Sequence, residues 1–471
     1  MSKGYIGVDL GTTGTKSILF DERGNVLGKG YKGYGLITPK EGYFEQNACD
    51  WYNAVVCTVK EAVKDFDGQV VGISFSAQGG SFILADIDKD GKIVPLTNAL
   101  TWMDNRATEE VKELGDKAYS IAGLKLGAGS SLCRLLWLKK HCPNEYSKTK
   151  IILTTSDYIY YMLIGKKVID YTSAYMMDIF DGENLCWNDS LLELVGLNKN
   201  QLPNPISAGE YLGDCNDNFI KATGLKGKVK VYSGVHDQFA ASLGLNYFGS
   251  NDLLISTGTT WVVFGKSDKN IHLNFFKMKH PVGGYGYFAS AISSGTVLSW
   301  EKDLFSTDYD NLNVGVEKAP FDDKLLVYPF ISGNGVYRGE NNQSFSVHNV
   351  NFKHTKFDIV KATMEGVAFE IKYIIDTCRE KGFKIGNIII TGGATRSNAW
   401  MQILADVIGK KLYLSQQADG CCFGAYSVAK KGEKGEYVTF NFDGNIIEPQ
   451  KELSKKYEEK YSKYNKGFVV K

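Results

Sequence analysis

Short apolar runs alternate with polar turns in the first part of the chain. Residues 5–21 contain two apolar runs on either side of a Gly/Thr turn, which predicts a β-hairpin. After a polar turn, a third strand is expected at 26–30. Residues 51–64 repeat apolar side chains at the spacing of one helix face, and residues 70–76 form a short apolar run typical of a buried strand. The pattern therefore predicts the order β-β-β-α-β.

The same strand–turn–strand pattern returns near the middle of the chain. Residues 253–265 read Leu-Leu-Ile-Ser-Thr-Gly-Thr-Thr-Trp-Val-Val-Phe-Gly, and Gly258 lies 247 positions after Gly11. Because the whole context repeats, we predict two related α/β domains that each offer one Gly-Thr-Thr turn to a shared ligand. We place these domains at residues 1–247 and 248–471.

The second half alternates helical and strand-like segments. Its apolar spacing predicts, in order, a helix at 293–303, a strand at 325–329, a helix at 358–381, a strand at 384–390, a helix at 397–408, a strand at 411–415 and a small-residue helix at 420–430. The highly charged tail at 448–463 is predicted to be a solvated terminal helix rather than a binding element.

Composition narrows the functional class. The 471 residues are 43% apolar and 23% charged, and 54 basic against 53 acidic residues leave a net charge of +1. This balance argues against a surface that binds nucleic acid through bulk charge. The nine cysteines are scattered, contain no CxxC pair and are odd in number. They are therefore poor material for a disulfide framework or a zinc site, and they suit a reducing compartment.

The apolar runs are all short. The N-terminal residues run at once into a strand-like segment that contains Asp9, unlike the longer apolar stretch of a signal peptide. No run approaches the roughly 18 apolar residues of a membrane helix. We therefore expect a cytoplasmic protein with no membrane partner.

The first turn carries groups that suit a phosphate. Residues 9–16 read Asp-Leu-Gly-Thr-Thr-Gly-Thr-Lys. Glycine lets the backbone approach a ligand, successive N–H groups form an anion nest, and Lys16 can add a cation. Asp9, at the end of the strand, can hold Mg²⁺ through hard oxygen ligands. The alternative is a plain hairpin whose threonines merely suit a strand. The spacing is not that of a Walker A loop.

A second small-residue turn stands at Gly392-Gly393-Ala394, after an apolar run and before a helical segment. Small residues at such a turn allow a flat ring such as adenine to pack against the backbone. An ordinary strand–helix turn would have the same composition, so the pattern alone leaves both interpretations open.

Asp237 lies where a strand ends near Gly234 and a small-residue helix begins near Gln238. A carboxylate at this position can cap the helix, or it can face a ligand as a general base. The neighbouring His236 is either a ligand contact or a structural histidine.

Two loop-like segments carry groups that bind polyhydroxy ligands. The first is 76–80, Ser-Ala-Gln-Gly-Gly, and the second is 101–106, Thr-Trp-Met-Asp-Asn-Arg. In the second, the alternative is that Asp104 and Arg106 only pair with each other.

Taken in order, these motifs resemble the FGGY family of carbohydrate kinases, members of the actin-like ATPase superfamily. The resemblance covers nearly the whole chain. Its most specific part is the segment 392–407, which is similar to the second family signature. Residues that resemble the first signature are Ser131, Arg134, Leu135, Trp137 and Leu138, with arginine where lysine is usual.

The resemblance implies an α/β fold of two actin-like (ribonuclease H-like) domains with ATP and a sugar in the cleft between them. It implies that the N-terminal domain holds the sugar and the C-terminal domain holds the nucleotide. Asp237 would be the general base, and Asp9 the magnesium-side carboxylate. The residues expected to bind sugar are Gln78, Gly79, Trp102, Asp237 and Gln238. The residues expected to bind ATP are Gly11, Thr12, Thr13, Lys16, Gly258, Thr259, Gly295, Gly393 and Ser397.

The implied function is an ATP-dependent sugar kinase, a cytoplasmic transferase with Mg²⁺ that phosphorylates a ketose such as xylulose. A polyol, gluconate or sedoheptulose stays open as substrate, because Gly79-Gly80 follow Gln78 where xylulokinases usually have Met-His-Gly. Asp237-Gln238 is similar to the glycerol kinase branch. The family also implies a homodimer. The alternative from another class is a non-enzymatic actin-like ATPase.

Overall fold

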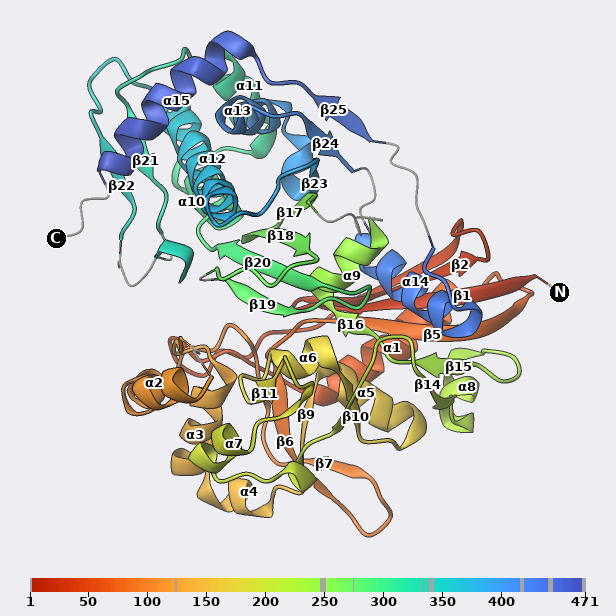
Figure 1. Cartoon of the computed structure of the whole chain (residues 1–471). Helices are drawn as coiled ribbons and strands as arrows, with labels where there is room; N and C mark the ends of the chain where they lie inside the picture. Colours follow the sequence, from red (N-terminus) through yellow and green to blue (C-terminus); the bar gives the residue numbers. More distant parts are fainter. Residues whose placement is uncertain are drawn as a thin grey trace. The chain divides into compact units, whose positions relative to one another are not determined.

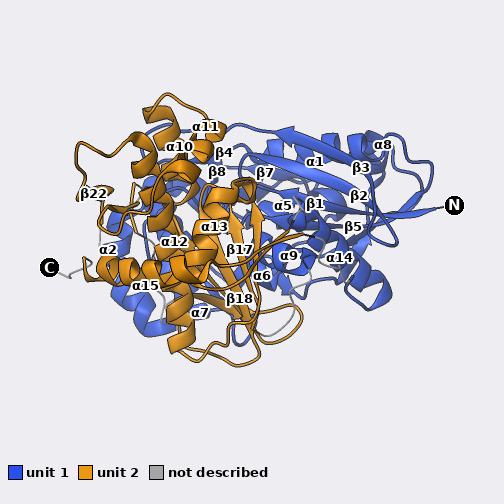
Figure 2. Cartoon of the chain, turned by 90° about the horizontal axis from the view of Figure 1, so that it is seen from above, with its two compact units in different colours: residues 1–246, 419–440 blue, residues 247–418, 441–471 orange. Residues whose placement is uncertain are grey.

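We analysed a computed structural model of the chain. It describes residues 2–122, 125–245, 251–273, 275–331, 333–334, 336–338, 343–415, 419–438 and 444–467. The chain divides into two compact units, residues 1–246 with 419–440 (unit 1) and residues 247–418 with 441–471 (unit 2), which Figure 2 colours separately. The predicted domain boundary at 247/248 lies outside the described residues and stays a prediction.

Unit 1 is built on a mixed sheet in which β1 runs antiparallel to β2 and parallel to β5 (Figure 1). In order across the sheet, the strands are β14 (Tyr211–Asp214), β15 (Lys230–Tyr232), β5 (Gln69–Ala77), β1 (Lys3–Leu10), β2 (Gly14–Asp21) and β3 (Val26–Gly33), and β16 (Val235–His236) also pairs with β5. Helix α1 (Ala48–Ala62) precedes β5. The predicted hairpin, third strand, helix and buried strand are all confirmed.

Helices cover both faces of this sheet. Side chains alternate between the faces of a strand, so neighbours on β2 contact different helices. Leu19 packs in the same core as Trp51 of α1, whereas Phe20 stacks on Tyr426 of α14 (Gly420–Lys434), with ring centroids 4.8 Å apart. The last helix of unit 1 therefore comes from a segment far along the chain.

Helix α14 lies in direct backbone contact with its neighbours. A Cβ on Gly7 of β1 would stand 1.9 Å from the carbonyl oxygen of Cys422. A Cβ on Gly424 would stand 1.9 Å from the carbonyl oxygen of Ala240 in α9 (Asp237–Gly244). Only glycine permits these two approaches.

The rest of unit 1 holds a second sheet and the helices around it. The strands of this sheet are β4 (Glu45–Gln46), β8 (Ala99–Leu100), β6 (Phe82–Ile87), β7 (Ile93–Pro95) and β9 (Ile151–Thr154). Two small ribbons pair β10 (Val168–Asp170) with β13 (Asn204–Ile206) and β11 (Phe180–Asp181) with β12 (Cys186–Trp187). The helices are α2 (Thr108–Ala122), α3 (Ser131–His141), α4 (Pro143–Lys148), α5 (Thr155–Ile164), α6 (Tyr171–Tyr175), α7 (Asp189–Val195), a 3₁₀ turn at Lys199–Gln201 and α8 (Asp217–Thr223).

Unit 2 repeats the central strand pairing of unit 1. Its β17 runs antiparallel to β18 and parallel to β23, as β1 does with β2 and β5. The strands, in order, are β19 (Phe276–Lys279), β20 (Tyr285–Ala291), β18 (Trp261–Ser267), β17 (Leu253–Thr257), β23 (Ile388–Gly392), β24 (Leu412–Leu414) and β25 (Asn445–Ile447). The repeat seen in the sequence therefore corresponds to a repeat in topology.

The remaining elements of unit 2 surround this sheet. They are α10 (Gly295–Leu304), α11 (Tyr309–Lys318), α12 (Lys356–Glu380), α13 (Asn398–Ile408), α15 (Lys451–Lys466), the ribbon of β21 (Leu326–Tyr328) with β22 (Ser346–His348), and 3₁₀ turns at Val336–Arg338 and Gly393–Arg396. The predicted helices and strands of this half are confirmed with shifted ends. β23 begins later than predicted because its ladder with β17 starts at the pair Leu253–Ile388.

The charged tail forms the predicted helix, α15, but the prediction that it is solvated is wrong for one face. Tyr457, Tyr461 and Tyr464 are buried in the core of unit 2. Lys460 is also buried, and its ammonium group pairs with Glu365 of α12. The tail is thus a packed element of the unit.

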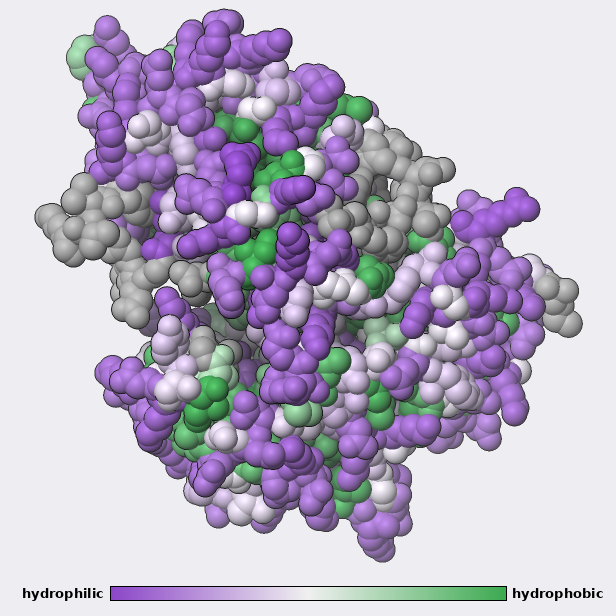
Figure 3. All heavy atoms as spheres, in the orientation of Figure 1, coloured by the Kyte–Doolittle hydropathy of each residue, from purple (hydrophilic) through white to green (hydrophobic). Residues whose placement is uncertain are grey.

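Hydrophilic side chains dominate the described surface on the face shown in Figure 3, and hydrophobic residues are scattered among them. Within the described ranges, we find no helix that combines the length and the apolarity needed to cross a membrane.

Candidate active site

The phosphate turn of unit 1 connects β1 to β2 and is held from outside. The N–H of Gly11 donates to the carbonyl of Gly14 at 3.0 Å, and the hydroxyl of Tyr34 donates to the carbonyl of Gly11 at 2.5 Å. Among the described residues, no protein acceptor takes the N–H groups of Thr12 and Thr13. The turn therefore presents two main-chain donors of the kind that an anion needs.

Asp9 lies at the end of β1 beside this turn. Its Oδ1 accepts the hydroxyl of Ser76 at 2.8 Å. Burial raises the pKa of Asp9 to about 6, and the negative charge of Asp237 adds to the effect. A bound cation would relieve this cost, so the site favours positive charge.

The predicted phosphate-side cation, Lys16, already has a partner. Its Nζ lies 2.5 Å from Oδ1 of Asp419, and Lys29 contacts the other oxygen of Asp419 at 2.8 Å. Burial disfavours the charged lysine, but the hydrogen bond and charge of Asp419 outweigh it and raise the pKa of Lys16. Lys16 thus remains charged and is oriented by a residue just before α14, a contact that the sequence interpretation missed.

The predicted sugar loop is tied to the phosphate turn through Gln46, which the sequence interpretation also missed. The amide of Gln78 donates to Oε1 of Gln46 at 3.0 Å, and the amide of Gln46 donates to the carbonyl of Thr12 at 2.6 Å. The indole N–H of Trp51 fixes the same Oε1 at 3.1 Å. Oε1 of Gln78 is buried without a hydrogen bond among the described residues, and so it remains available to a hydroxyl group.

The second predicted sugar-binding segment holds one exposed aromatic side chain and one buried ion pair. Trp102 is 44% exposed, and its indole N–H donates to the hydroxyl of Thr12 at 2.9 Å. Arg106 instead pairs with Asp104 at 2.8 Å and with Glu45 at 2.6 Å. Asp104 and Arg106 do pair with each other, but the alternative that they only pair with each other is wrong, because Arg106 also pairs with Glu45.

Arg134, the arginine in the first signature, is a buried bridge between the two loops. Its guanidinium donates to the carbonyls of Gly80 at 2.5 Å and Thr101 at 2.6 Å. Burial lowers the pKa of Arg134 to about 10. The residue fixes the backbone of both predicted sugar-binding segments.

Asp237 is the first residue of α9, and the N-cap position belongs to His236. The alternative that Asp237 caps this helix is therefore wrong. Its side chain is 33% exposed, and Oδ1 lies 3.3 Å from Nε2 of His236 without forming a hydrogen bond among the described residues. Oε1 of Gln238 also has no hydrogen-bond partner there. Both side chains keep acceptor oxygens for a ligand.

The phosphate turn of unit 2 brings three predicted nucleotide residues together. The N–H of Gly258 donates to the carbonyl of Thr260 at 3.3 Å, and the carbonyl of Thr259 accepts the N–H of Thr296 at 2.9 Å. A Cβ on Gly295 would stand 2.1 Å from the carbonyl oxygen of Gly258. The start of α10 therefore packs directly on this turn.

Gly393 begins the 3₁₀ turn that follows β23, and Ser397 comes directly after the turn. The hydroxyl of Ser397 caps α13 by accepting the N–H of Trp400 at 3.2 Å, and it donates to Asn313 at 2.6 Å. This hydroxyl is already used within unit 2, so a nucleotide contact would have to share it.

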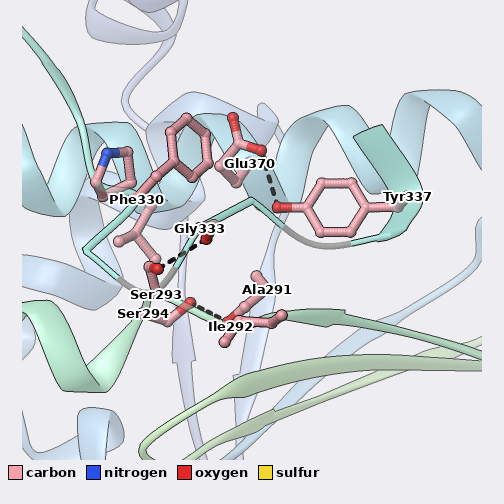
Figure 4. Close-up of a pocket in the computed structure, with 10 residues that line it drawn as sticks. Ala291, Ile292, Ser293, Ser294, Phe330, Gly333, Tyr337 and Glu370 are labelled. Atoms are coloured by element: carbon pink, nitrogen blue, oxygen red, sulfur yellow. Dashed lines mark hydrogen bonds between the residues drawn. The ribbon is translucent and has the colours of Figure 1, made fainter. Parts of the chain in front are cut away.

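A small pocket in unit 2 is lined in part by residues 291–294, which come just before α10. Figure 4 shows how the polar groups of this pocket face one another. The hydroxyl of Ser293 donates to the carbonyl of Gly333 at 2.9 Å, and that of Tyr337 donates to Glu370 at 2.8 Å. None of the predicted site residues lines this pocket.

The described residues contain no group of three or more His, Cys, Asp or Glu side chains that could hold a metal ion. Mg²⁺ does not need such a group, because it commonly binds one or two carboxylates together with waters and substrate phosphates. The half-buried carboxylate of Asp9, with one oxygen bound to Ser76, fits this requirement.

Comparisons with known proteins identify the family of the chain. Residues 4–244 match the N-terminal domain, and residues 253–431 the C-terminal domain, of the FGGY family of carbohydrate kinases. The chain is 27% identical to a xylulose kinase of Bacillus subtilis, over 91% of this chain and 88% of that protein. It is 26% identical to a gluconokinase of Bacillus licheniformis, over 90% of this chain and 86% of that protein.

Solved structures show the same fold. A ligand-bound xylulose kinase from Lactobacillus acidophilus superposes with a TM-score of 0.90 at 22% identity, covering 98% of this chain and 97% of that one. A glycerol kinase from Plasmodium falciparum with ADP superposes with a TM-score of 0.89 at 19% identity, covering 100% and 99%.

Proposed function

The chain belongs to the FGGY family of carbohydrate kinases, which are ATP-dependent, and we propose that it phosphorylates a ketose, a pentulose or hexulose such as xylulose. The relatives named xylulose kinase support this substrate class. The non-enzymatic alternative loses its support, because both matching family models describe carbohydrate kinases.

Unit 1 supplies the sugar side of the reaction. Gln78, Trp102 and Gln238 offer an amide oxygen, an exposed indole and a second amide, which are groups that bind hydroxyls. The carboxylate of Asp237 takes the proton of the attacking hydroxyl, while the sugar oxygen forms its bond to the γ-phosphorus. The bond from that phosphorus to the β-phosphate oxygen breaks, and ADP leaves with the electron pair.

The two Gly-Thr-Thr turns hold the phosphates. The N–H groups of Thr12 and Thr13 in unit 1, and the turn at Gly258 and Thr259 in unit 2, bind phosphate oxygens at the points where charge moves. Gly295, Gly393 and Ser397 hold the nucleotide. Asp9 would hold Mg²⁺, which neutralises phosphate charge when bound. Lys16 adds a cation whose direction is set by Asp419.

The observation that carries this proposal is the connected polar set in unit 1. Hydrogen bonds join Gln78, Gln46, Thr12 and Trp102. The predicted sugar loop and the phosphate turn are therefore held together by one hydrogen-bond network. A site that only hydrolysed ATP would have no need of the buried acceptor on Gln78.

ADP release in the presence of a sugar panel tests the substrate. The panel contains xylulose, ribulose, fructose, sedoheptulose, gluconate and glycerol. We expect the highest kcat/KM with a ketose. Gluconate is the second candidate, because the Bacillus licheniformis gluconokinase is nearly as similar as the xylulose kinases. ADP release that no sugar stimulates would overturn the proposal.

Asp237→Asn tests the base. The substitution keeps the size of the side chain but removes the proton acceptor. We expect turnover to fall roughly 100-fold or more, about 2.7 kcal/mol of barrier, with an unchanged melting temperature. An Asn variant that keeps turnover within about tenfold of the parent would show that the base lies elsewhere.

We also propose a homodimer. Light scattering on the purified protein should then give about twice the chain mass of 52.2 kDa.

A further inference from the structure

We propose that His236 is a positioning residue that fixes the carboxylate of Asp237, and that Gly79 of the sugar loop is a glycine because the imidazole ring fills the space of its side chain. The inference rests on the proposed function, in which Asp237 is the base.

The backbone of His236 is held by a buried chain of hydrogen bonds. Its N–H donates to the hydroxyl of Thr172 at 2.7 Å. That hydroxyl in turn bonds to Oδ1 of Asp170, which also caps α6 by accepting the N–H of Ser173 at 3.0 Å. The position of His236 is therefore set by the start of α6 as well as by its own strand.

The ring of His236 is locked against the sugar loop. A Cβ on Gly79 would stand 2.4 Å from Cδ2 and 2.5 Å from Nε2 of the ring, far inside van der Waals contact. On another side, the ring meets Phe239 edge-on at 6.4 Å between centroids. The residue is only 4% exposed, so the imidazole has little freedom to move.

Carboxylates from two other elements interact with this ring. Nε2 lies 3.3 Å from Oδ1 of Asp237 on α9. Asp170, fully buried at the end of β10, interacts electrostatically with His236. Burial raises the pKa of Asp170, and its negative charge also acts on the buried Asp157 of α5. The direction of Nε2 toward Asp237 is set by its 3.3 Å approach to Oδ1, on a ring that packs against Gly79 and Phe239.

This arrangement makes the two oxygens of Asp237 different. Nε2 faces Oδ1, which is buried and has no hydrogen bond among the described residues. Contacts of this kind are often long without substrate and shorten in the complex. When Nε2–H donates to Oδ1, Oδ2 is left to accept the proton of the sugar hydroxyl. His236 of the predicted catalytic motif and Gly79 of the predicted sugar loop thus fit each other, because the imidazole occupies the space that a side chain at position 79 would need.

Four variants test the proposal by steady-state kinetics with the sugar that the parent phosphorylates. His236→Ala should lower kcat about 10- to 100-fold, because misplacing a reacting group by about 1 Å can cost that much, and should leave the KM for sugar within about threefold. His236→Gln should restore most of kcat, because its amide N–H can donate to Oδ1. Gly79→Ala should lower kcat as His236→Ala does by displacing the ring, and its Cβ would also press on Cγ of Met176, 2.6 Å away. Gly115→Ala is the control, because its Cβ would meet nothing within 4 Å.

Three results would overturn the proposal. One is a raised KM for sugar with unchanged kcat, which would make His236 a sugar ligand. Another is a lowered melting temperature with unchanged kcat, which would make it purely structural. The third is a His236→Gln variant as slow as His236→Ala. If Gly79→Ala does not fold, the two His236 variants still decide the question.

A measurement without turnover separates this inference from the proposed function. The chain has six histidines, so ring ¹⁵N signals can be assigned by comparison with His236→Gln. In Asp237→Asn, the ring signals of His236 should shift while the others stay in place. Unshifted signals would overturn the contact, even if the parent phosphorylates sugar. A parent that phosphorylates no sugar, but shows the shift, would overturn only the proposed function.

Discussion

Replacing Lys460 of α15 by methionine should strongly destabilise unit 2. Lys460 and Glu365 are each only 2% exposed, and they pair with each other between α15 and α12. Methionine keeps most of the lysine stem, so little packing is lost. The change leaves the Glu365 carboxylate buried without its ammonium partner. It keeps the hydrogen bond from the hydroxyl of Tyr457, at 2.9 Å.

The expected magnitude follows from that uncompensated charge. Removing one partner of a buried ion pair typically costs about 3–5 kcal/mol, whereas replacing both partners by apolar residues is often nearly neutral. Lys460→Met should therefore lose roughly 3–5 kcal/mol. The double variant Lys460→Met/Glu365→Leu should recover much of that loss.

Urea unfolding followed by circular dichroism and tryptophan fluorescence measures these differences. The matched control is Lys455→Met on the same helix, where Lys455 and Glu452 form a pair with side chains 76% and 84% exposed. That control should leave the midpoint unchanged, because solvent screens exposed pairs. A Lys460→Met midpoint as close to the parent as the control would refute the reasoning. A double variant as unstable as the single one would show that packing, not charge, sets the cost.

Two further predictions concern unit 2. Burial raises the pKa of Glu301 from 4.5 to about 7. The folded state therefore holds a proton that the unfolded state releases, and the contribution of Glu301 falls as pH rises from about 4.5 to about 7, by up to roughly 3 kcal/mol. Glu301→Gln should remove that slope in unfolding titrations at pH 5 and 8, and equal slopes for parent and variant would contradict it. Gly295→Ala should destabilise by about 1–3 kcal/mol and weaken ADP binding in calorimetry, because its Cβ would press on the carbonyl of Gly258. Gly258→Ala is the matched control for stability, because its Cβ would have its nearest neighbour at 3.6 Å. Equal melting temperatures for both variants would disprove the crowding.

The elements that the sequence predicted are those whose cause is local. The hairpin with Gly11 and the matching turn with Gly258 follow from apolar runs and glycines that adjoin in sequence, and both are confirmed. The bridge between Lys16 and Asp419 joins residues 403 positions apart, and no local pattern indicates it. Gln46 was missed for the same reason, because its role depends on the fold bringing it beside Gln78 and Thr12, which lie more than 30 positions away in the sequence.

The C-terminal helix shows that the sequence contained a sign of burial that its many charged residues outweighed. Tyr457, Tyr461 and Tyr464 follow the spacing of one helix face, which could have predicted a packed surface. The charged residues between them favoured the solvated interpretation. At Asp237 the sequence predicted both the end of the strand and the start of the helix. It did not predict that His236 is the N-cap residue, which the structure shows.

The position of α14 has a consequence for how the chain is made. A ribosome that has finished residues 1–246 has synthesised every strand of the unit 1 sheet, but not the helix that covers one of its faces. Tyr5, Ile18 and Phe20 on that face stay exposed until residues 420–434 emerge. Unit 1 therefore completes its fold only after unit 2 is almost fully synthesised. A gene cut between the halves would yield a first fragment with a bare aromatic surface, which is an aggregation hazard during synthesis.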